Sequence, residues 1–190
     1  MQKKGIHFKT YKKFYFCLGI MGVSVLVWSL AESLSLTSGL LNFPPENTFR
    51  KKAPQFELST PEGEKVGLEG FRGRWVVLHF WASWCPPCLE EIPEWLEAVA
   101  FFKNRPVQWI AISLDSSWSE AFKVLPSLKP LDNLIFLLDS SAQVANQYGS
   151  FQFPETYLLD HDLKVAFKWV GPQNWAHPDF LKQLEQLMEH

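Results

Sequence analysis

The chain has 190 residues, of which 47% are hydrophobic and 15% aromatic, enough for one well-packed domain with an additional segment at one end. Its formal net charge of −2 is unevenly distributed, because residues 1–31 hold five of the 18 basic residues and none of the 20 acidic ones. The remainder has 13 basic and 20 acidic residues, a net charge of −7. An acidic region without a basic stripe is poorly suited to a phosphate backbone, so we expect no nucleic-acid partner.

The N-terminal segment has the pattern of an export signal. Residues 1–13 carry five lysines and are expected to stay in the cytoplasm as a basic tail. The 18 uncharged residues 14–31 (FYFCLGIMGVSVLVWSLA) predict a signal-anchor that spans a membrane, with the rest of the chain on the outer side. The alternative is a signal peptide cleaved after Ala31, which would release the exported part from the membrane.

The predicted elements follow a linker. Residues 32–52 mix serine, proline and charge without periodicity, and the folded domain is expected over residues 53–190. Apolar runs and turn residues predict strands near Phe56 and over 66–71 (strand or loop), 75–82, 107–115, 134–139, 156–160 and 164–170, and helices over 86–103, 117–125, 142–149 and 178–190. Strands that alternate with helices and then form a hairpin predict an α/β fold with a mixed central sheet flanked by helices.

The stretch HFWASWCPPCLEEIP (residues 79–93) places Cys85 and Cys88 directly after a buried strand, at the first turn of a helix. Unpaired N–H groups and the helix dipole favour a thiolate there, so we predict that Cys85 is the nucleophile, with a moderately lowered pKa. Cys88, one turn later, would close a redox-active disulfide or attack a mixed disulfide. Pro86 and Pro87 suit the first helical positions, which need no N–H of their own.

Three other uses of this cysteine pair are weaker. A structural zinc site needs two further ligands, and no second CxxC or paired histidine spacing supplies them. Copper delivery would need His161, which lies at the far end of its predicted strand. A purely structural disulfide closing so short a loop would contribute little stability. We therefore expect no metal and no cofactor.

The stretches APQFELSTPEGEKVGLEGFRGRWVVLHFWASWCPPC (residues 53–88) and FPETYLLDHDLKV (residues 153–165) resemble the membrane-anchored thioredoxin-like proteins of the TlpA, ResA and CcmG (DsbE) type. The resemblance extends from residue 53 to the C-terminus. It implies a thioredoxin-like fold and an extracytoplasmic thiol-disulfide oxidoreductase, often one that keeps apocytochrome c reduced for haem attachment. The implied location is the bacterial inner membrane, with the domain facing the periplasm or the outside, or the periplasm itself if the signal is cleaved. The implied partners are exported cysteine-containing proteins, apocytochrome c among them, and an inner-membrane thiol carrier as electron donor.

The resemblance also implies site residues. Trp84 and Pro87 match the active-site motif around the two cysteines, with Pro86 beside them as support. Pro154 matches the cis-proline whose loop lies beside the thiols. Glu155 and Thr156 complete the PET sequence of the cytochrome-maturation members and are expected to line the substrate groove, although the preceding GSFQF departs from their pattern.

Two further residues bear on proton transfer during thiol exchange. Glu91 follows Cys88 by three residues and should point inward, whereas Glu90 should face solvent. The resemblance implies a buried acid at Glu91, which could act as base for Cys88. His79, six residues before Cys85, is either a core histidine or a part of the site.

The leading hypothesis is a dithiol reductant for exported proteins, in cytochrome c maturation by preference. A general exported disulfide reductase and a peroxide-reducing redoxin are the alternatives. Peroxidases of the redoxin group carry threonine three residues before the reactive cysteine, where this chain has Ala82. An inert binding module is disfavoured by the intact CxxC.

Overall fold

The computed structural model describes residues 51–124 and 131–189. The predicted basic tail, the predicted membrane segment and nearly all of the predicted linker lie outside the described residues. Within residues 51–124 and 131–189, no helix is both long enough and apolar enough to cross a membrane.

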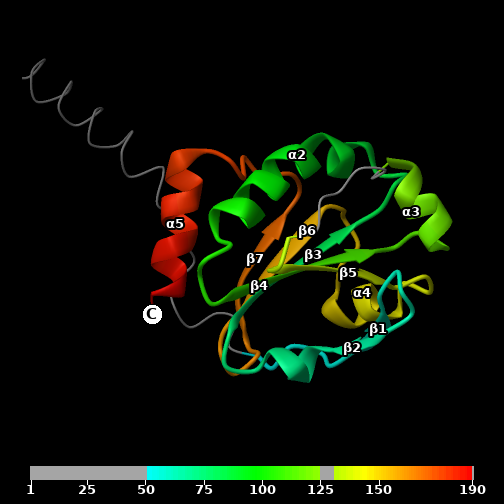
Figure 1. Ribbon diagram of the computed structural model, residues 1–190, viewed down its shortest axis with the longest axis horizontal. Coiled ribbons are helices and arrows are strands. Elements are labelled where there is room, and N and C mark those ends of the chain that lie inside the picture. The colour runs from blue at the N-terminus through cyan, green and yellow to red at the C-terminus, as the bar shows by residue number, and fades with distance from the viewer. Residues whose placement is uncertain (1–50, 125–130, 190) are drawn as a thin grey trace, which may run out of the picture. The chain divides into compact units, whose positions relative to one another are not determined.

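Seven strands form one mixed sheet in the order β2-β1-β5-β4-β3-β6-β7 (Figure 1). Strands β3, β4 and β5 are parallel, whereas β6 runs antiparallel to β3, and β7 runs antiparallel to β6. The strand bounds are β1 Glu57–Ser59, β2 Lys65–Gly67, β3 Trp75–Trp81, β4 Val107–Ser113, β5 Leu134–Leu138, β6 Glu155–Leu159 and β7 Val165–Val170. The predicted mixed sheet flanked by helices is confirmed, and it has the thioredoxin-like arrangement.

Strand β3 lies in the interior of the sheet, and all seven of its residues are buried. A strand covered on both faces needs apolar or fully paired side chains throughout, which explains the continuous run WVVLHFW. The end of β3 leads to Cys85, so a fully buried strand in the interior of the sheet positions the dithiol.

The helices cover the two faces of the sheet. Their bounds are η1 Leu68–Phe71 (a short 3₁₀ helix), α2 Pro86–Phe101, α3 Trp118–Val124, α4 Gln143–Tyr148 and α5 Pro178–Met188. Consecutive residues of β3 point to opposite faces. His79 stacks on Trp95 of α2, with ring centroids 4.8 Å apart, whereas Phe80 lies 5.5 Å from the ring of Tyr148 of α4. Helix α2 therefore covers one face and α4 the other.

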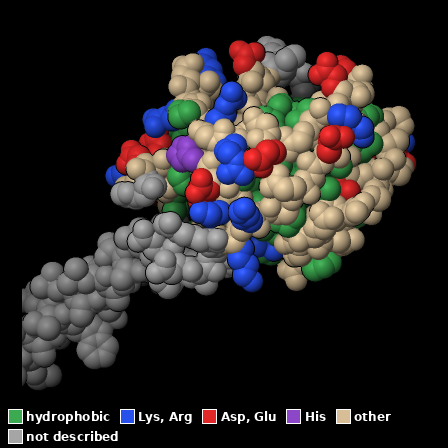
Figure 2. Space-filling model, turned by 90° about the horizontal axis from the view of Figure 1, so that it is seen from below, with side chains coloured by type: hydrophobic (Ala, Val, Ile, Leu, Met, Phe, Trp, Pro, Cys, Tyr) green, Lys and Arg blue, Asp and Glu red, His purple; other side chains and the backbone are tan. Residues whose placement is uncertain are grey.

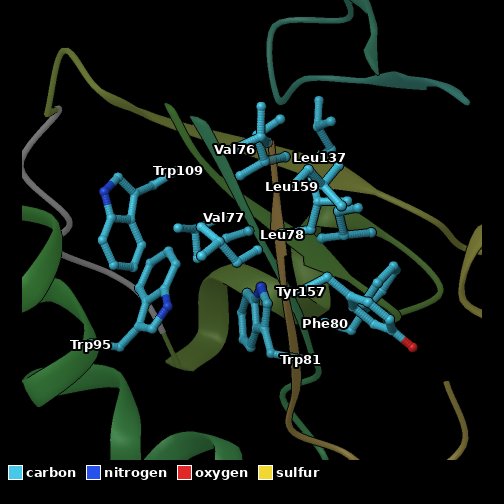
Figure 3. Close-up of a cluster of buried hydrophobic side chains, with 14 of the residues drawn as sticks. Val76, Val77, Leu78, Phe80, Trp81, Trp95, Trp109, Leu137, Tyr157 and Leu159 are labelled. Atoms are coloured by element: carbon cyan, nitrogen blue, oxygen red, sulfur yellow. The ribbon is translucent and has the colours of Figure 1, made fainter. Parts of the chain in front are cut away.

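Tryptophan fills much of the core on the α2 side. Trp81, Trp95, Trp109 and Trp175 are all less than 2% exposed. Trp95 and Trp109 meet edge to face with ring centroids 5.5 Å apart, and Figure 3 shows them together on one side of the sheet. Rings of this size each bury a large apolar area and contact many neighbours, so they fix α2 firmly against the strands.

The predicted elements differ from the observed ones mainly at their ends. Strand β1 begins at Glu57, just after Phe56. The segment 66–71, predicted as strand or loop, contains the end of strand β2 and then the short helix η1. Helix α2 ends at Phe101 and contains Pro93. These segments are short or lie at helix ends, where hydrogen bonding to the rest of the fold outweighs local propensity.

Charged side chains of both signs are mixed on the face drawn in Figure 2. Some opposite charges on the domain form close pairs, as in Arg72–Glu69 and Lys164–Asp162. Exposed pairs of this kind contribute little to stability, because water screens them.

Candidate active site

The two cysteines lie at the junction of β3 and α2. Cys85 is the N-cap residue of α2 and has an extended backbone, and Pro86 and Pro87 occupy the first helical positions. The backbone N–H of Cys88 donates to Cys85 Sγ at 3.3 Å. The two sulfur atoms form a disulfide of 2.06 Å. After reduction, the same N–H donor and the helix dipole would stabilise a thiolate on Cys85.

Access to the two sulfur atoms differs. Cys85 is 5% exposed, whereas Cys88 is 0% exposed because it faces the sheet from the first turn of α2. Trp84, the residue before Cys85, is 60% exposed. A disulfide on another protein could therefore reach Cys85 more readily than Cys88, which is fully covered.

Pro154 lies on the neighbouring loop. The Phe153–Pro154 peptide bond is cis, as the resemblance implied. Strand β6 begins at the next residue and pairs with β3 in a register that sets Glu155 opposite Phe80. Because Phe80 is near the end of β3, this register brings Pro154 close to the start of the Cys85 loop.

Aromatic side chains lie in both the Cys85 loop and the Pro154 loop. The rings of Trp84 and Phe153 meet edge to face with centroids 6.1 Å apart. Phe151, two residues earlier in the Pro154 loop, is 72% exposed. Large apolar side chains exposed together commonly mark a surface that contacts another molecule.

Glu91 is buried one turn after Cys88. Its carboxylate oxygen Oε2 accepts hydrogen bonds from the backbone N–H of Gln173 and the indole N–H of Trp175, both at 2.9 Å. Burial is the main cause that raises the pKa of Glu91 to about 7; the two donors oppose it, and the charge of Glu94 adds to it. Glu90 is exposed, as predicted. A carboxyl group that titrates near neutral pH is suited to exchange protons with a thiol.

His79 lies between the Trp95 and Trp175 rings, 1% exposed. Its Nδ1 is 2.9 Å from the hydroxyl oxygen of Thr156, and its Nε2 is 3.5 Å from Oε1 of Glu91. Burial lowers the pKa of His79 to about 3, so the isolated imidazole is neutral at neutral pH. The sequence left the role of His79 open, and the structure brings it against Glu91.

With this geometry in place, comparison with known proteins identifies the family. Residues 49–168 match the AhpC/TSA family. The chain belongs to the AhpC/TSA family. It is 30% identical over 164 residues to the Bacillus cereus thiol-disulfide oxidoreductase ResA, covering 85% of this chain and 93% of that protein.

Two solved structures support the same grouping. A Chlorobium tepidum protein assigned as thiol:disulfide interchange protein DsbE is 32% identical, has a TM-score of 0.63 and matches 74% of this chain and 94% of its own. A Bacteroides fragilis thiol-disulfide oxidoreductase is 31% identical, with a TM-score of 0.57, and matches 70% of this chain and 99% of its own. Within the AhpC/TSA family, this protein is thus a thiol-disulfide oxidoreductase of the ResA and DsbE type.

Two residues of this AhpC/TSA member lie elsewhere than the sequence suggested. Glu155 and Thr156 are 3% and 2% exposed. The Glu155 carboxylate pairs with Lys168 Nζ at 2.8 Å and accepts a hydrogen bond from the Tyr157 hydroxyl, while Thr156 contacts His79 on the opposite face of β6. The expectation that Glu155 meets a partner directly does not match this geometry. Both faces of β6 are covered, so neither Glu155 on one face nor Thr156 on the other is exposed to a partner.

Asp115 is a residue of the site to which the sequence did not point. Its buried carboxylate accepts hydrogen bonds from the Ser83 N–H at 3.1 Å, the Ser83 hydroxyl at 2.6 Å and the Ser113 hydroxyl at 2.7 Å. These bonds hold the loop two residues before Cys85. One signal in the sequence could have predicted this contact. Asp115 follows β4, and adjacent parallel strands such as β3 and β4 end at the same edge of the sheet, so Asp115 should lie near the residues that follow β3.

The histidine considered for a copper site lies far along the sheet from the dithiol. His161 packs edge to face against Trp75, with ring centroids 5.2 Å apart. Trp75 begins β3, whereas Cys85 follows its end. Among residues 51–124 and 131–189, no three His, Cys, Asp or Glu side chains form a group that could hold a metal ion.

Proposed function

We propose that this protein is an extracytoplasmic dithiol reductant, held at the bacterial inner membrane by residues 14–31, that reduces disulfides in exported proteins, with apocytochrome c as its preferred substrate. The observation that carries the reductase mechanism is the asymmetric pair of sulfur atoms at the start of α2. Cys85 is partly accessible and Cys88 is covered, with the buried acid Glu91 one turn beyond it. Cys85 can thus form a mixed disulfide with a partner, and Cys88 can then resolve that mixed disulfide.

The electron transfer follows from this arrangement. The Cys85 thiolate attacks one sulfur of the partner's disulfide, which breaks, and the other partner sulfur leaves as a thiolate. Cys88 then attacks Cys85, which forms the Cys85–Cys88 disulfide and releases the second partner thiolate. Two electrons pass to the partner. A membrane thiol carrier would return the protein to its dithiol form, and anchoring would raise the effective concentration of that carrier.

The exposed aromatic residues support a polypeptide partner. Trp84 precedes Cys85 and Phe151 lies in the Pro154 loop, and both offer exposed apolar surface to an extended, unfolded segment. The charge of −7 after residue 31 favours a basic partner. Glu155 supplies none of this charge to a partner, since it is buried against Lys168.

A general exported disulfide reductase is the second candidate, and the burial of Glu155 favours it. Because Glu155 is not available to a bound partner, only the exposed aromatic residues remain for partner recognition, and they would not distinguish a haem-attachment sequence from other unfolded segments. The peroxidase alternative lacks the threonine, because the position three residues before Cys85 is the fully buried Ala82.

The experiment is a deletion strain assayed for covalently bound c-type haem. We expect a loss of c-type cytochrome, restored by an external thiol reductant and by the intact gene but not by a Cys85→Ser gene. Normal cytochrome with misoxidised exported proteins would support the general reductase instead. Normal cytochrome and normal exported disulfides would reject both.

A further inference from the structure

The contacts of His79 and Glu91 leave one atom of each without a conventional hydrogen bond. In the part of the chain that the structure describes, His79 Nε2 and Glu91 Oε1 are both buried and have no hydrogen-bond partner, and they face each other at 3.5 Å. Buried polar atoms are almost always paired in folded proteins. The 3.5 Å separation leaves room for one proton between the two atoms, either on His79 Nε2 or on Glu91 Oε1.

The remaining atoms of the pair restrict where that proton can lie. Glu91 Oε2 already accepts two N–H donors, from Gln173 and Trp175, so an acid proton on this carboxyl belongs on Oε1. On the other ring nitrogen of His79, Nδ1 contacts the Thr156 hydroxyl, which can donate or accept. The imidazole can therefore donate from Nε2 to a carboxylate or accept at Nε2 from a carboxylic acid.

We propose that His79 is a positioning residue that acts through Glu91: its Nε2 faces Oε1 of Glu91 and shares with it the proton that this acid, already expected as the base for Cys88, takes from the thiol. The inference rests on the proposed function only in requiring that Cys85 and Cys88 exchange with a partner's disulfide. Burial raises the pKa of Glu91 to about 7 and lowers that of His79 to about 3, so the pair gains or loses its proton near neutral pH.

The proton step fits the second half of the exchange reaction. In the mixed disulfide, Cys85 Sγ is bonded to a partner sulfur and Cys88 is a thiol. Cys88 gives its proton to the pair, and its thiolate attacks Cys85 Sγ. The bond between Cys85 and the partner breaks, and the partner's sulfur leaves with the electron pair. One proton has moved to His79 and Glu91, and two electrons have moved to the partner.

The surroundings of the pair set the direction of the expected effect. Helix α2 contributes Cys88 one turn before Glu91 and Glu94 three residues after it, β6 contributes the hydroxyl of Thr156, and the segment before α5 contributes neutral N–H donors. The Nε2–H of His79 stabilises the charged carboxylate. Its removal should therefore raise the pKa of Glu91 further and delay proton release from Cys88 to higher pH.

The test uses the reduced full-length protein and the small uncharged probe 2-hydroxyethyl disulfide. Quenched mass analysis of the peptide that contains Cys85 separates formation of the mixed disulfide from its resolution by Cys88, and it excludes adducts on Cys17. The rate of each step is measured across neutral pH. The variants are His79→Asn, Glu91→Gln and the double variant, with His161→Asn as a matched histidine loss at the other end of β3.

We expect His79→Asn to move the midpoint of the resolution step upward by about one pH unit, with the attack step unchanged. Glu91→Gln should remove that midpoint, the double variant should match Glu91→Gln, and His161→Asn should match the unmodified protein. No shift in His79→Asn, a downward shift, or an equal effect of His79→Asn in the Glu91→Gln background would overturn the proposal.

Thr156→Val provides the same test if His79→Asn does not fold. It removes only the hydroxyl at Nδ1, and it should shift the midpoint in the same direction by less. If it leaves the midpoint unchanged, the proposal also fails. A failure of the unmodified protein to react with the probe would instead refute the proposed reductase function, so the two failures are distinguishable.

Discussion

Cys85 and Cys88 differ chiefly in access, and this difference assigns their order of reaction. Replacing Cys88 by alanine removes the resolving thiol and leaves the accessible one, so a partner should remain bound through Cys85. We predict that Cys88→Ala accumulates a stable mixed disulfide with a CxxCH peptide in non-reducing mass analysis. The matched Cys85→Ala variant should accumulate little. Stronger trapping through Cys88 would reverse the assignment.

Glu91 and His79 link the stability of the domain to pH in opposite directions. The pKa of Glu91 is about 7 in the folded protein against 4.5 as its ordinary value, so its stabilising contribution is complete below about pH 4.5 and is lost as the pH rises through about 7. The pKa of His79 is about 3 against 6.5, so its contribution is present above about pH 6.5 and is lost as the pH falls towards 3.

Glu91→Gln should isolate the contribution of Glu91. The difference in the free energy of unfolding between the variant and the unmodified protein should be about 2 kcal/mol more in favour of the variant at pH 8 than at pH 5. The reason is that the variant has no buried carboxyl group that must ionise as the pH rises. Urea unfolding of the oxidised protein at both pH values measures the difference. The neighbouring exposed Glu90→Gln provides the control, and it should show no pH-dependent difference. Equal effects in both variants would mean that Glu91 is ionised as freely as a surface acid.

At the scale of the elements, β4 supports the active-site loop through Asp115. Removing this carboxylate leaves the N–H and hydroxyl of Ser83 without their acceptor. We predict that Asp115→Ala lowers the free energy of unfolding by about 2–4 kcal/mol and changes the alkylation rate of Cys85. Asp139→Ala is the matched control, because Asp139 is also buried but accepts from Ala145 N–H in α4. It should cost stability without changing Cys85. Unchanged alkylation in Asp115→Ala would show that the loop is held by other contacts.

The sequence predicted these elements unevenly, for physical reasons. The apolar run of β3 and the prolines after Cys85 are local signals, and both were interpreted correctly. The inward position of Glu91 follows from helical spacing alone. By contrast, the Asp115–Ser83 bonds join segments 32 residues apart, and the burial of Glu155 depends on Lys168 of β7. Such contacts depend on which strands become neighbours, which local periodicity does not encode.

At the scale of the whole molecule, the proposed export fixes where the dithiol can react. Lysines before residue 14 should remain in the cytoplasm, and the domain should lie on the other side of the membrane. We predict that, in intact spheroplasts, a membrane-impermeant maleimide labels Cys85 of a Cys17→Ala, Cys88→Ala variant after mild reduction. A variant with Cys17 alone should stay unlabelled. Labelling of Cys85 only after lysis would reject the proposed topology.

The hydrogen bond from the Trp175 indole to Glu91 makes the site optically observable. A charge that appears or disappears beside an indole ring in a buried, weakly screened environment shifts the absorption and emission of that ring. Ultraviolet difference spectra should therefore contain a component that follows the ionisation of Glu91, and Trp175→Phe should remove it. One tryptophan of the core would then serve as a built-in indicator of the protonation state of the acid beneath the dithiol.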